Sequence, residues 1–176
     1  MSRLKSVGVA ALWFVRLATS PALAGDGQDF VARFSGGWSG MGQLLFGTTE
    51  GMTFDCKLAG VPSRTGLTFS VDGQCAMAGF SAPVHAQLRY NSETNRFYGE
   101  FLGGSRGDGL DLVGARLADG YSLQLMRGPA QGRLFAETIG PDRMRVTIFY
   151  RDRPRNRELP MAAMDLARTY TGTAGK

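Results

Sequence analysis

Apolar and polar side chains alternate with a period of two residues through most of the chain beyond residue 37. The clearest runs are 52–58, 67–77, 84–90 and 121–125, where nearly every second residue is apolar. Successive side chains of a strand point to opposite faces of a sheet. The pattern therefore predicts strands with one buried and one solvated face. The same alternation continues, less regularly, through 38–46, 97–101, 110–117, 133–139 and 144–150.

Turn-forming segments separate these runs. Residues 91–95, 119–120 and 140–142 are rich in Asn, Asp, Gly and Pro, the residues that tight turns prefer. Turns about ten residues apart, joining about eight or nine strands, are typical of an antiparallel sandwich or barrel. Closing the sheet also removes its exposed edges. We predict an all-β fold, an antiparallel up-and-down β-barrel, with a short C-terminal helix from Glu158 to Tyr170 that has Pro160 in its first turn.

Composition agrees with a packed, turn-rich domain. Glycine contributes 25 of 176 residues, about twice its usual share. Only 7 residues are proline and 43% are hydrophobic. These values exclude a collagen-like or disordered chain, and the length suits one domain.

The N-terminus has the pattern of an export signal. Arg3 and Lys5 precede an apolar run over 7–15, and a small-x-small site ends at Ala24. Nine apolar residues are too few to span a bilayer, which takes about 20. We therefore expect a signal peptide over 1–24, cleavage after Ala24, and a periplasmic or secreted mature protein without a transmembrane segment. Removing the signal's three basic residues lowers the formal net charge from +5 to +2.

The remaining chain divides into an extension over 25–36, a barrel over 37–158, and a short helix with a tail over 159–176.

The two cysteines test the hairpin pattern. Cys56 and Cys75 lie in phase with the apolar faces of two neighbouring runs, and a tight turn at Thr65-Gly66 would place them directly opposite each other. Directly opposed side chains lie close enough for a disulfide, and export favours its formation. We predict a Cys56–Cys75 bridge worth roughly 3 kcal/mol. The alternative is a pair of buried free thiols.

No recognisable catalytic constellation appears in the sequence. Ser105 lies in a G-x-S-x-G match over 103–107, but the following residues indicate a strand, whereas the serine-hydrolase elbow requires a helix. His85, the only histidine, falls on the polar face of another run, with no carboxylate assignable as its neighbour. We expect no catalytic residue, no metal site and no cofactor.

A basic stretch lies near the C-terminus. Five arginines form a candidate anion or partner patch: Arg143, Arg151, Arg153, Arg155 and Arg157. Arginine suits anions because it donates bidentate hydrogen bonds. The alternative is that these charges solvate the last strand. Aromatic residues are too sparse around them to indicate nucleic-acid binding.

Gly36-Gly37-Trp38, at the start of the first run, fits a G-x-W motif. With the antiparallel body, this resembles the lipocalin-like (calycin) small barrels. The resemblance implies that Trp38 closes the barrel floor beneath an arginine from the last strand, either Arg145 or Arg151. The family's T-D-Y motif is absent, and a bridge within one hairpin is not its usual disulfide. The chain is similarly close to small secreted protease inhibitors built on a single-disulfide barrel.

Two functions follow from these expectations. The lipocalin resemblance implies a small apolar or amphipathic ligand held inside the barrel. The predicted inward residues include Phe54, Phe69, Phe97, Phe101 and Tyr121. The alternative is an interaction module or inhibitor that meets an envelope protein through the glycine loop 103–109 or the stretch 151–157. The sequence does not decide whether the barrel interior is filled or hollow.

Overall fold

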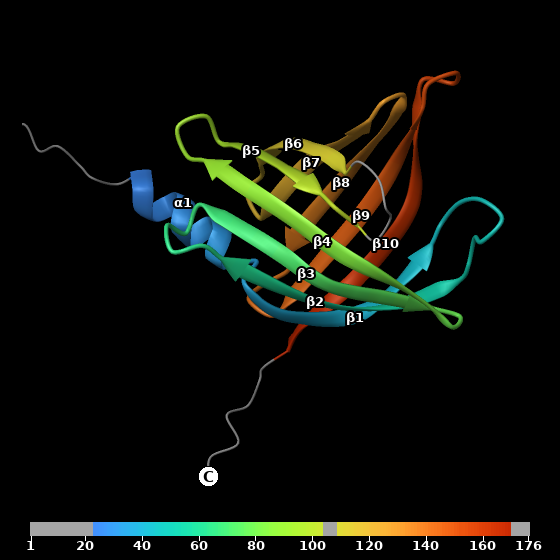
Figure 1. Cartoon of the computed structure of the whole chain (residues 1–176), viewed down its shortest axis with the longest axis horizontal. Coiled ribbons are helices and arrows are strands. Elements are labelled where there is room, and N and C mark those ends of the chain that lie inside the picture. The colour runs from blue at the N-terminus through green and yellow to red at the C-terminus, as the bar shows by residue number, and fades with distance from the viewer. Residues whose placement is uncertain (1–22, 104–108, 170–176) are drawn as a thin grey trace, which may run out of the picture.

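The computed structural model describes residues 23–103 and 109–169, which form one helix and ten strands (Figure 1). The elements are α1 (Leu23–Ala32), β1 (Gly36–Leu44), β2 (Thr53–Pro62), β3 (Thr68–Met77), β4 (Phe80–Asn91), β5 (Arg96–Phe101), β6 (Leu110–Arg116), β7 (Gly120–Arg127), β8 (Ala130–Thr138), β9 (Arg143–Asp152) and β10 (Arg157–Thr169). Most of the predicted signal peptide, residues 104–108 of the glycine loop with Ser105, and the tail from Tyr170 lie outside the described residues.

The strands form a closed up-and-down barrel. Each strand pairs antiparallel with its neighbours in sequence, and β1 pairs with β10 to complete the circle. The predicted all-β antiparallel barrel is confirmed, with ten strands rather than eight or nine.

The additional strand is β10, where the sequence favoured a helix. Residues 157–169 pair with β9 on one side and β1 on the other. The predicted C-terminal helix is therefore wrong, and the barrel extends past residue 158 to Thr169. The alanine, leucine and methionine of this segment favour a helix locally. A helix here would leave β1 and β9 as open sheet edges, and the strand pairs with both of them. An irregularity between Pro160 and Ala162 accommodates the proline in this strand.

The β2–β3 hairpin has the predicted register. Gly66 adopts a φ of 70° in the turn, where glycine avoids the strain of a side chain. Cys56 pairs with Cys75 across the ladder, and the two form a disulfide. The predicted bridge is confirmed, and it lies on the inner face because Cys56 is buried and Cys75 lines the interior.

The two ends of the barrel differ. Helix α1 lies across the end at which β1 begins, which we call the closed end (Figure 1). Phe30 and Val31 of α1, and Phe34 just after it, are almost completely buried there. We call the other end, reached by the loops 45–52, 78–79, 128–129 and 153–156, the open end.

Candidate functional site: an apolar cavity open at one end

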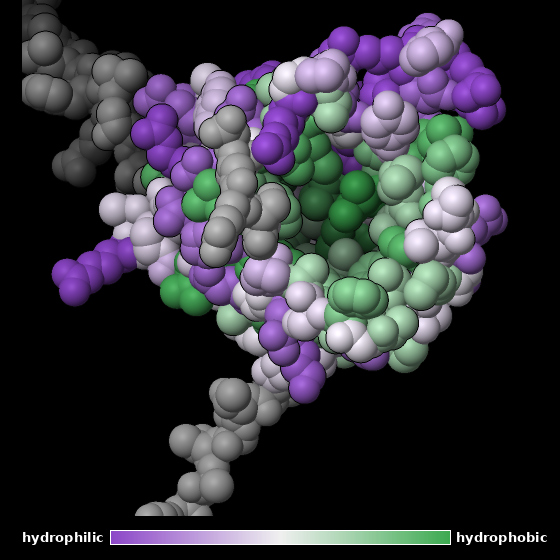
Figure 2. All heavy atoms as spheres, turned by 45° about the vertical axis from the view of Figure 1, so that its right-hand side comes forward, coloured by the Kyte–Doolittle hydropathy of each residue, from purple (hydrophilic) through white to green (hydrophobic). Residues whose placement is uncertain are grey.

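A cavity of about 650 Å³ occupies the barrel interior between the closed end and the open end. Figure 2 shows it as a hollow lined by hydrophobic residues. Each described strand except β5 and β10 contributes two or more lining side chains. Strand β5 contributes Phe101, and β10 contributes Met164. The volume falls within the range of about 300–1,000 Å³ found for small-molecule sites. The interior left undecided by the sequence is therefore hollow.

The lining is apolar on almost every side. Among the described residues that line it, none is Asp, Glu, His, Lys or Arg. Aliphatic and methionine side chains dominate: Leu44, Leu58, Val71, Met77, Val84, Leu88, Leu110, Leu112, Leu123, Leu125, Leu134, Met144, Val146, Ile148 and Met164. Such a surface attracts an apolar molecule because transfer out of water is favourable.

The predicted aromatic residues occupy two levels of the barrel. Phe54, Phe101 and Tyr121 line the cavity. Phe69 and Phe97 are fully buried in the aromatic floor below it, where their ring centroids lie 6.4 Å apart. Two of the five predicted lining residues, Phe69 and Phe97, therefore lie in the floor and not along the cavity. Both are close to the start of their strands, β3 and β5, which begin at the closed end.

The floor is assembled around α1. The Phe34 ring meets Tyr121 edge-on with centroids 4.8 Å apart, and Phe30 lies 6.0 Å from Phe97. Arg116 places its guanidinium 4.3 Å from the centre of the Phe30 ring and binds Asp26 at 2.6 Å. These contacts attach the helix to the barrel, so the closed end is plugged by side chains from residues that the sequence analysis treated as an extension.

Trp38 lies in the floor, and its arginine partner is neither of the two that the lipocalin resemblance implied. The Arg168 guanidinium lies 4.2 Å from the centre of the Trp38 ring. The Trp38 indole donates a hydrogen bond of 3.1 Å to the carbonyl oxygen of Phe34. Arg168 also donates to the carbonyl oxygens of Arg33 at 2.8 Å, of Pro141 at 3.1 Å, and of Ser35. Arg168 therefore joins the N-terminal segment, β1 and β10 at the closed end.

Neither predicted floor arginine contacts Trp38. Arg145 lies on the outer face of β9 and binds Asp165 at 2.7 Å. Arg151 lies near the open end, where it donates to Asn156 at 2.7 Å. Arg168 was not among the predicted floor residues because residues 158–170 were expected to form a helix. In the barrel, Trp38 pairs directly with Arg168.

Tyr121 supplies a polar group inside the cavity. Its side chain is 6% exposed, and no described residue forms a hydrogen bond with its hydroxyl. No fully buried polar side-chain atom is left unsatisfied in the described part of the chain, and Tyr121 is one of the residues that line the cavity. Burial raises the pKa of Tyr121 well above its ordinary value, and the group therefore stays a neutral hydrogen-bond donor.

The predicted basic patch divides between the two ends of the barrel. Arg143 begins β9 at the closed end, whereas Arg151 and the loop beyond it lie at the open end. Eight residues of strand separate these positions by about 26 Å. The arginine hairpin, defined as residues 151–157, is one feature, and Arg143 does not belong to it.

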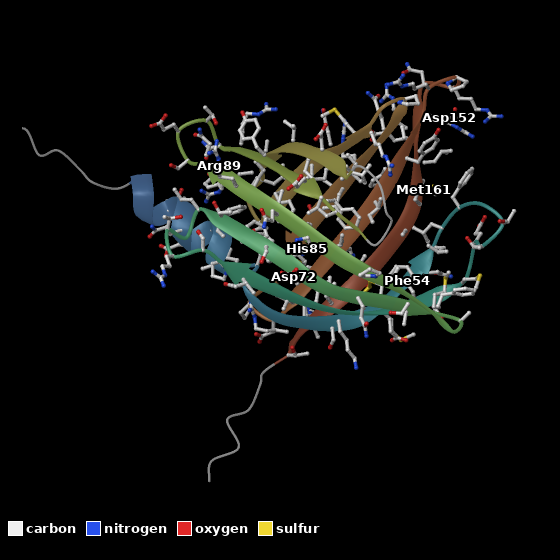
Figure 3. All side chains as sticks on the ribbon, viewed as in Figure 1. Phe54, Asp72, His85, Arg89, Asp152 and Met161 are labelled. Atoms are coloured by element: carbon white, nitrogen blue, oxygen red, sulfur yellow. A yellow bond between two sulfur atoms is a disulfide. The ribbon has the colours of Figure 1, made fainter. Side chains whose placement is uncertain are left out.

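Asp152 organises the arginine hairpin (Figure 3). Its carboxylate is 3.1 Å from Arg155 and 3.9 Å from Arg157. The hydrogen bond from Arg155 lowers the pKa of Asp152, so the carboxylate remains charged. Glu158 lies 3.2 Å from Arg133 and 3.8 Å from Arg151 on the neighbouring outer face.

His85 has the carboxylate neighbour that the sequence analysis did not assign. Asp72 on β3 pairs with His85 on β4, and their side chains form a hydrogen bond on the outer face (Figure 3). This hydrogen bond is the largest cause of a lowered pKa at Asp72, followed by one from Ser70. Both side chains are partly exposed and lie outside the cavity, so the pair cannot act on a molecule bound inside. The strand register around the turn at Ala78-Gly79 was the signal that would have found it.

The described residues form neither a cluster of metal ligands nor a membrane-spanning helix. Over residues 23–103 and 109–169, no three His, Cys, Asp or Glu side chains come together as a metal site would require. No helix in the described part of the chain has the length and apolar character needed to cross a membrane.

Comparisons with known proteins identify the fold. No family model matches the chain. No curated protein matches it either. The chain is similar to the crystal structure of Rv2717c from M. tuberculosis, with a TM-score of 0.62 and 14% sequence identity over 82% of this chain and 98% of that one. At this identity the likeness shows a shared small-barrel fold and nothing about activity.

Proposed function

We propose that this protein is an exported, non-catalytic binding protein that holds a small apolar or amphipathic molecule inside its barrel. The observation that carries the proposal is the cavity of about 650 Å³ with an apolar lining. A closed end and an opposite open end give the ligand one route of entry. The Trp38–Arg168 contact supports the lipocalin-like assignment, because an arginine of the last strand covers the motif tryptophan.

The lining favours binding over catalysis. General acid–base or nucleophilic chemistry needs titratable groups within hydrogen-bond reach of one another. Tyr121 is the one titratable side chain among the described lining residues, apart from the bridged Cys75. A neutral hydroxyl on an apolar wall orients a ligand that carries one polar group.

The proposed export is compatible with the plugged end. Cleavage after Ala24 leaves Phe30, Val31 and Phe34 in the mature protein, so the plug remains complete. Export also gives the Cys56–Cys75 bridge an oxidising environment in which to persist.

Native mass spectrometry of protein purified from the periplasm tests the proposal, with N-phenyl-1-naphthylamine as an apolar fluorescent probe. We expect a co-purifying small molecule, or probe binding at one site per chain. Ala86→Trp places bulk on a cavity-lining position, and Gln87→Trp adds the same side chain to the exposed face of the same strand. Probe affinity should fall at least about tenfold in Ala86→Trp, since a filled pocket forfeits the apolar burial, and should persist in Gln87→Trp.

Equal probe binding by the two variants, each shown by circular dichroism to retain the barrel, would exclude the cavity as the site. A protein that carries no small molecule and binds no probe would reject the proposed function.

A further inference from the structure

Large apolar side chains are exposed around the open end of the barrel. Four lie on three segments that border the opening: Phe46 and Met52 in the loop between β1 and β2, Phe80 at the start of β4, and Leu102 after β5. Phe80 is 79% exposed although it also lines the cavity. Tyr150, near the end of β9, adds a fifth exposed side chain at this end. We call these five residues the apolar rim.

Positive charge accompanies the apolar rim. The arginine hairpin with the adjacent Arg133 and Glu158 contains five arginines against two carboxylates, which leaves a net charge of +3. Asp152 and Glu158 are both engaged by arginines of this group. Arg153 is exposed and forms no ion pair with a described residue. Hydrophilic residues border the opening above its hydrophobic side in Figure 2.

Exposed apolar side chains bordered by arginines match the chemistry of a membrane surface. Apolar and aromatic side chains enter the boundary between headgroups and acyl chains, while cations attract anionic headgroups. A soluble small molecule inside the cavity would not require hydrophobic side chains on the outside of the opening. An acidic protein would satisfy the arginines but leave unexplained why exposed apolar residues border the entrance.

We propose that the open end docks on an anionic phospholipid membrane, with the apolar rim inserted at the interface and the arginine hairpin bound to phosphate headgroups. Docking in this orientation places the cavity entrance against the bilayer and the plugged end away from it. The inference depends on the surface alone, so it does not require that the cavity be occupied.

Co-sedimentation of the mature, oxidised protein with vesicles tests the docking. Vesicles of phosphatidylcholine alone are compared with vesicles of phosphatidylcholine mixed with phosphatidylglycerol. We expect binding to the mixed vesicles, much weaker binding to phosphatidylcholine, and release at high salt, because exposed charges are screened.

Variants of the apolar rim have matched controls at the closed end. Phe80→Ser with Leu102→Ser removes two rim side chains, and we expect vesicle affinity to fall at least about tenfold. Val61→Ser with Ile139→Ser removes two hydrophobic side chains that are 54% and 41% exposed near the closed end. The control pair should bind vesicles as the unmodified protein does.

The charge variants follow the same design. Arg153→Gln with Arg157→Gln should lower affinity for the mixed vesicles about 25-fold at low salt, at about fivefold for each arginine near the surface. Arg64→Gln with Arg143→Gln removes two exposed arginines from the closed end and should have little effect.

Several results would overturn the docking. They are no binding to mixed vesicles, equal binding to both vesicle types, or equal losses in the rim variants and their controls. Rim variants that change only the capture of a protein partner would assign this end to that partner instead. The N-phenyl-1-naphthylamine measurement separates the two proposals: a protein that binds the probe but not vesicles retains the proposed function and loses this one.

Discussion

Arg168 is predicted to be the main polar stabiliser of the closed end. Its guanidinium donates to three backbone carbonyls, those of Arg33, Ser35 and Pro141, and lies over Trp38. Arg168→Met keeps an apolar stem beside the indole and removes the guanidinium. At about 1 kcal/mol for each hydrogen bond to a carbonyl that water can partly reach, and about 0.5–1 kcal/mol for the cation–π contact, the free energy of unfolding should fall by about 3–4 kcal/mol.

Two further variants make the result specific. Arg168→Lys keeps the charge but replaces the planar fork with one ammonium, so its loss should be intermediate. Arg145→Met removes an arginine from the outer face of β9, where its ion pair with Asp165 has both side chains more than half exposed. Such pairs contribute little, and this variant should be close to the unmodified protein.

Urea unfolding followed by tryptophan fluorescence measures these differences. Trp38 is the only tryptophan of the described residues, and it lies directly beneath Arg168, so its emission reports on the closed end. With a denaturant dependence of about 2 kcal/mol per molar, Arg168→Met should lower the midpoint by about 1.5–2 M. A loss of stability in Arg145→Met as large as that in Arg168→Met, or an unchanged midpoint in Arg168→Met, would refute this role of Arg168.

Three other predictions concern the wall and the outer face. Cys75→Ala should lower the free energy of unfolding by about 3 kcal/mol, because it opens a loop of 19 residues in the unfolded chain; thiol labelling of Cys56 in the oxidised native protein would contradict the bridge. Tyr121→Phe should leave the affinity for an apolar probe unchanged but weaken binding of any co-purified ligand that carries a hydrogen-bonding group, as measured by competition. The hydrogen bond from His85 lowers the pKa of Asp72 below 3.8. The stabilisation of the folded protein by this pair is therefore present above pH 3.8, and it is lost as the pH falls through the pKa that Asp72 has in the folded protein. The stability difference between the unmodified protein and Asp72→Asn should therefore shrink below about pH 4, and a difference independent of pH would refute this linkage.

Local patterns in the sequence determined most of the wall of the barrel. Alternation with a period of two requires only that each strand have one buried face. The strands could therefore be predicted without knowing which strands pair with them. The turn at Thr65-Gly66 fixed the register of one hairpin, and that register paired Cys56 with Cys75. Trp38 was identifiable because its motif lies at the start of the first strand.

The tertiary structure decided what no short segment contains. Residues 157–169 form a strand because two open sheet edges, far apart in sequence, bind it more favourably than a local helix would stabilise it. Only that closure brings Arg168 over Trp38, and only the pairing of β3 with β4 brings Asp72 to His85. Whether large inward side chains fill the barrel or surround a cavity depends on the barrel's circumference, and ten strands enclose more space than eight. The physical reason is the same in each case: hydrogen bonds between distant strands and the volume they enclose are properties of the closed sheet, and not of any residue's neighbours along the chain.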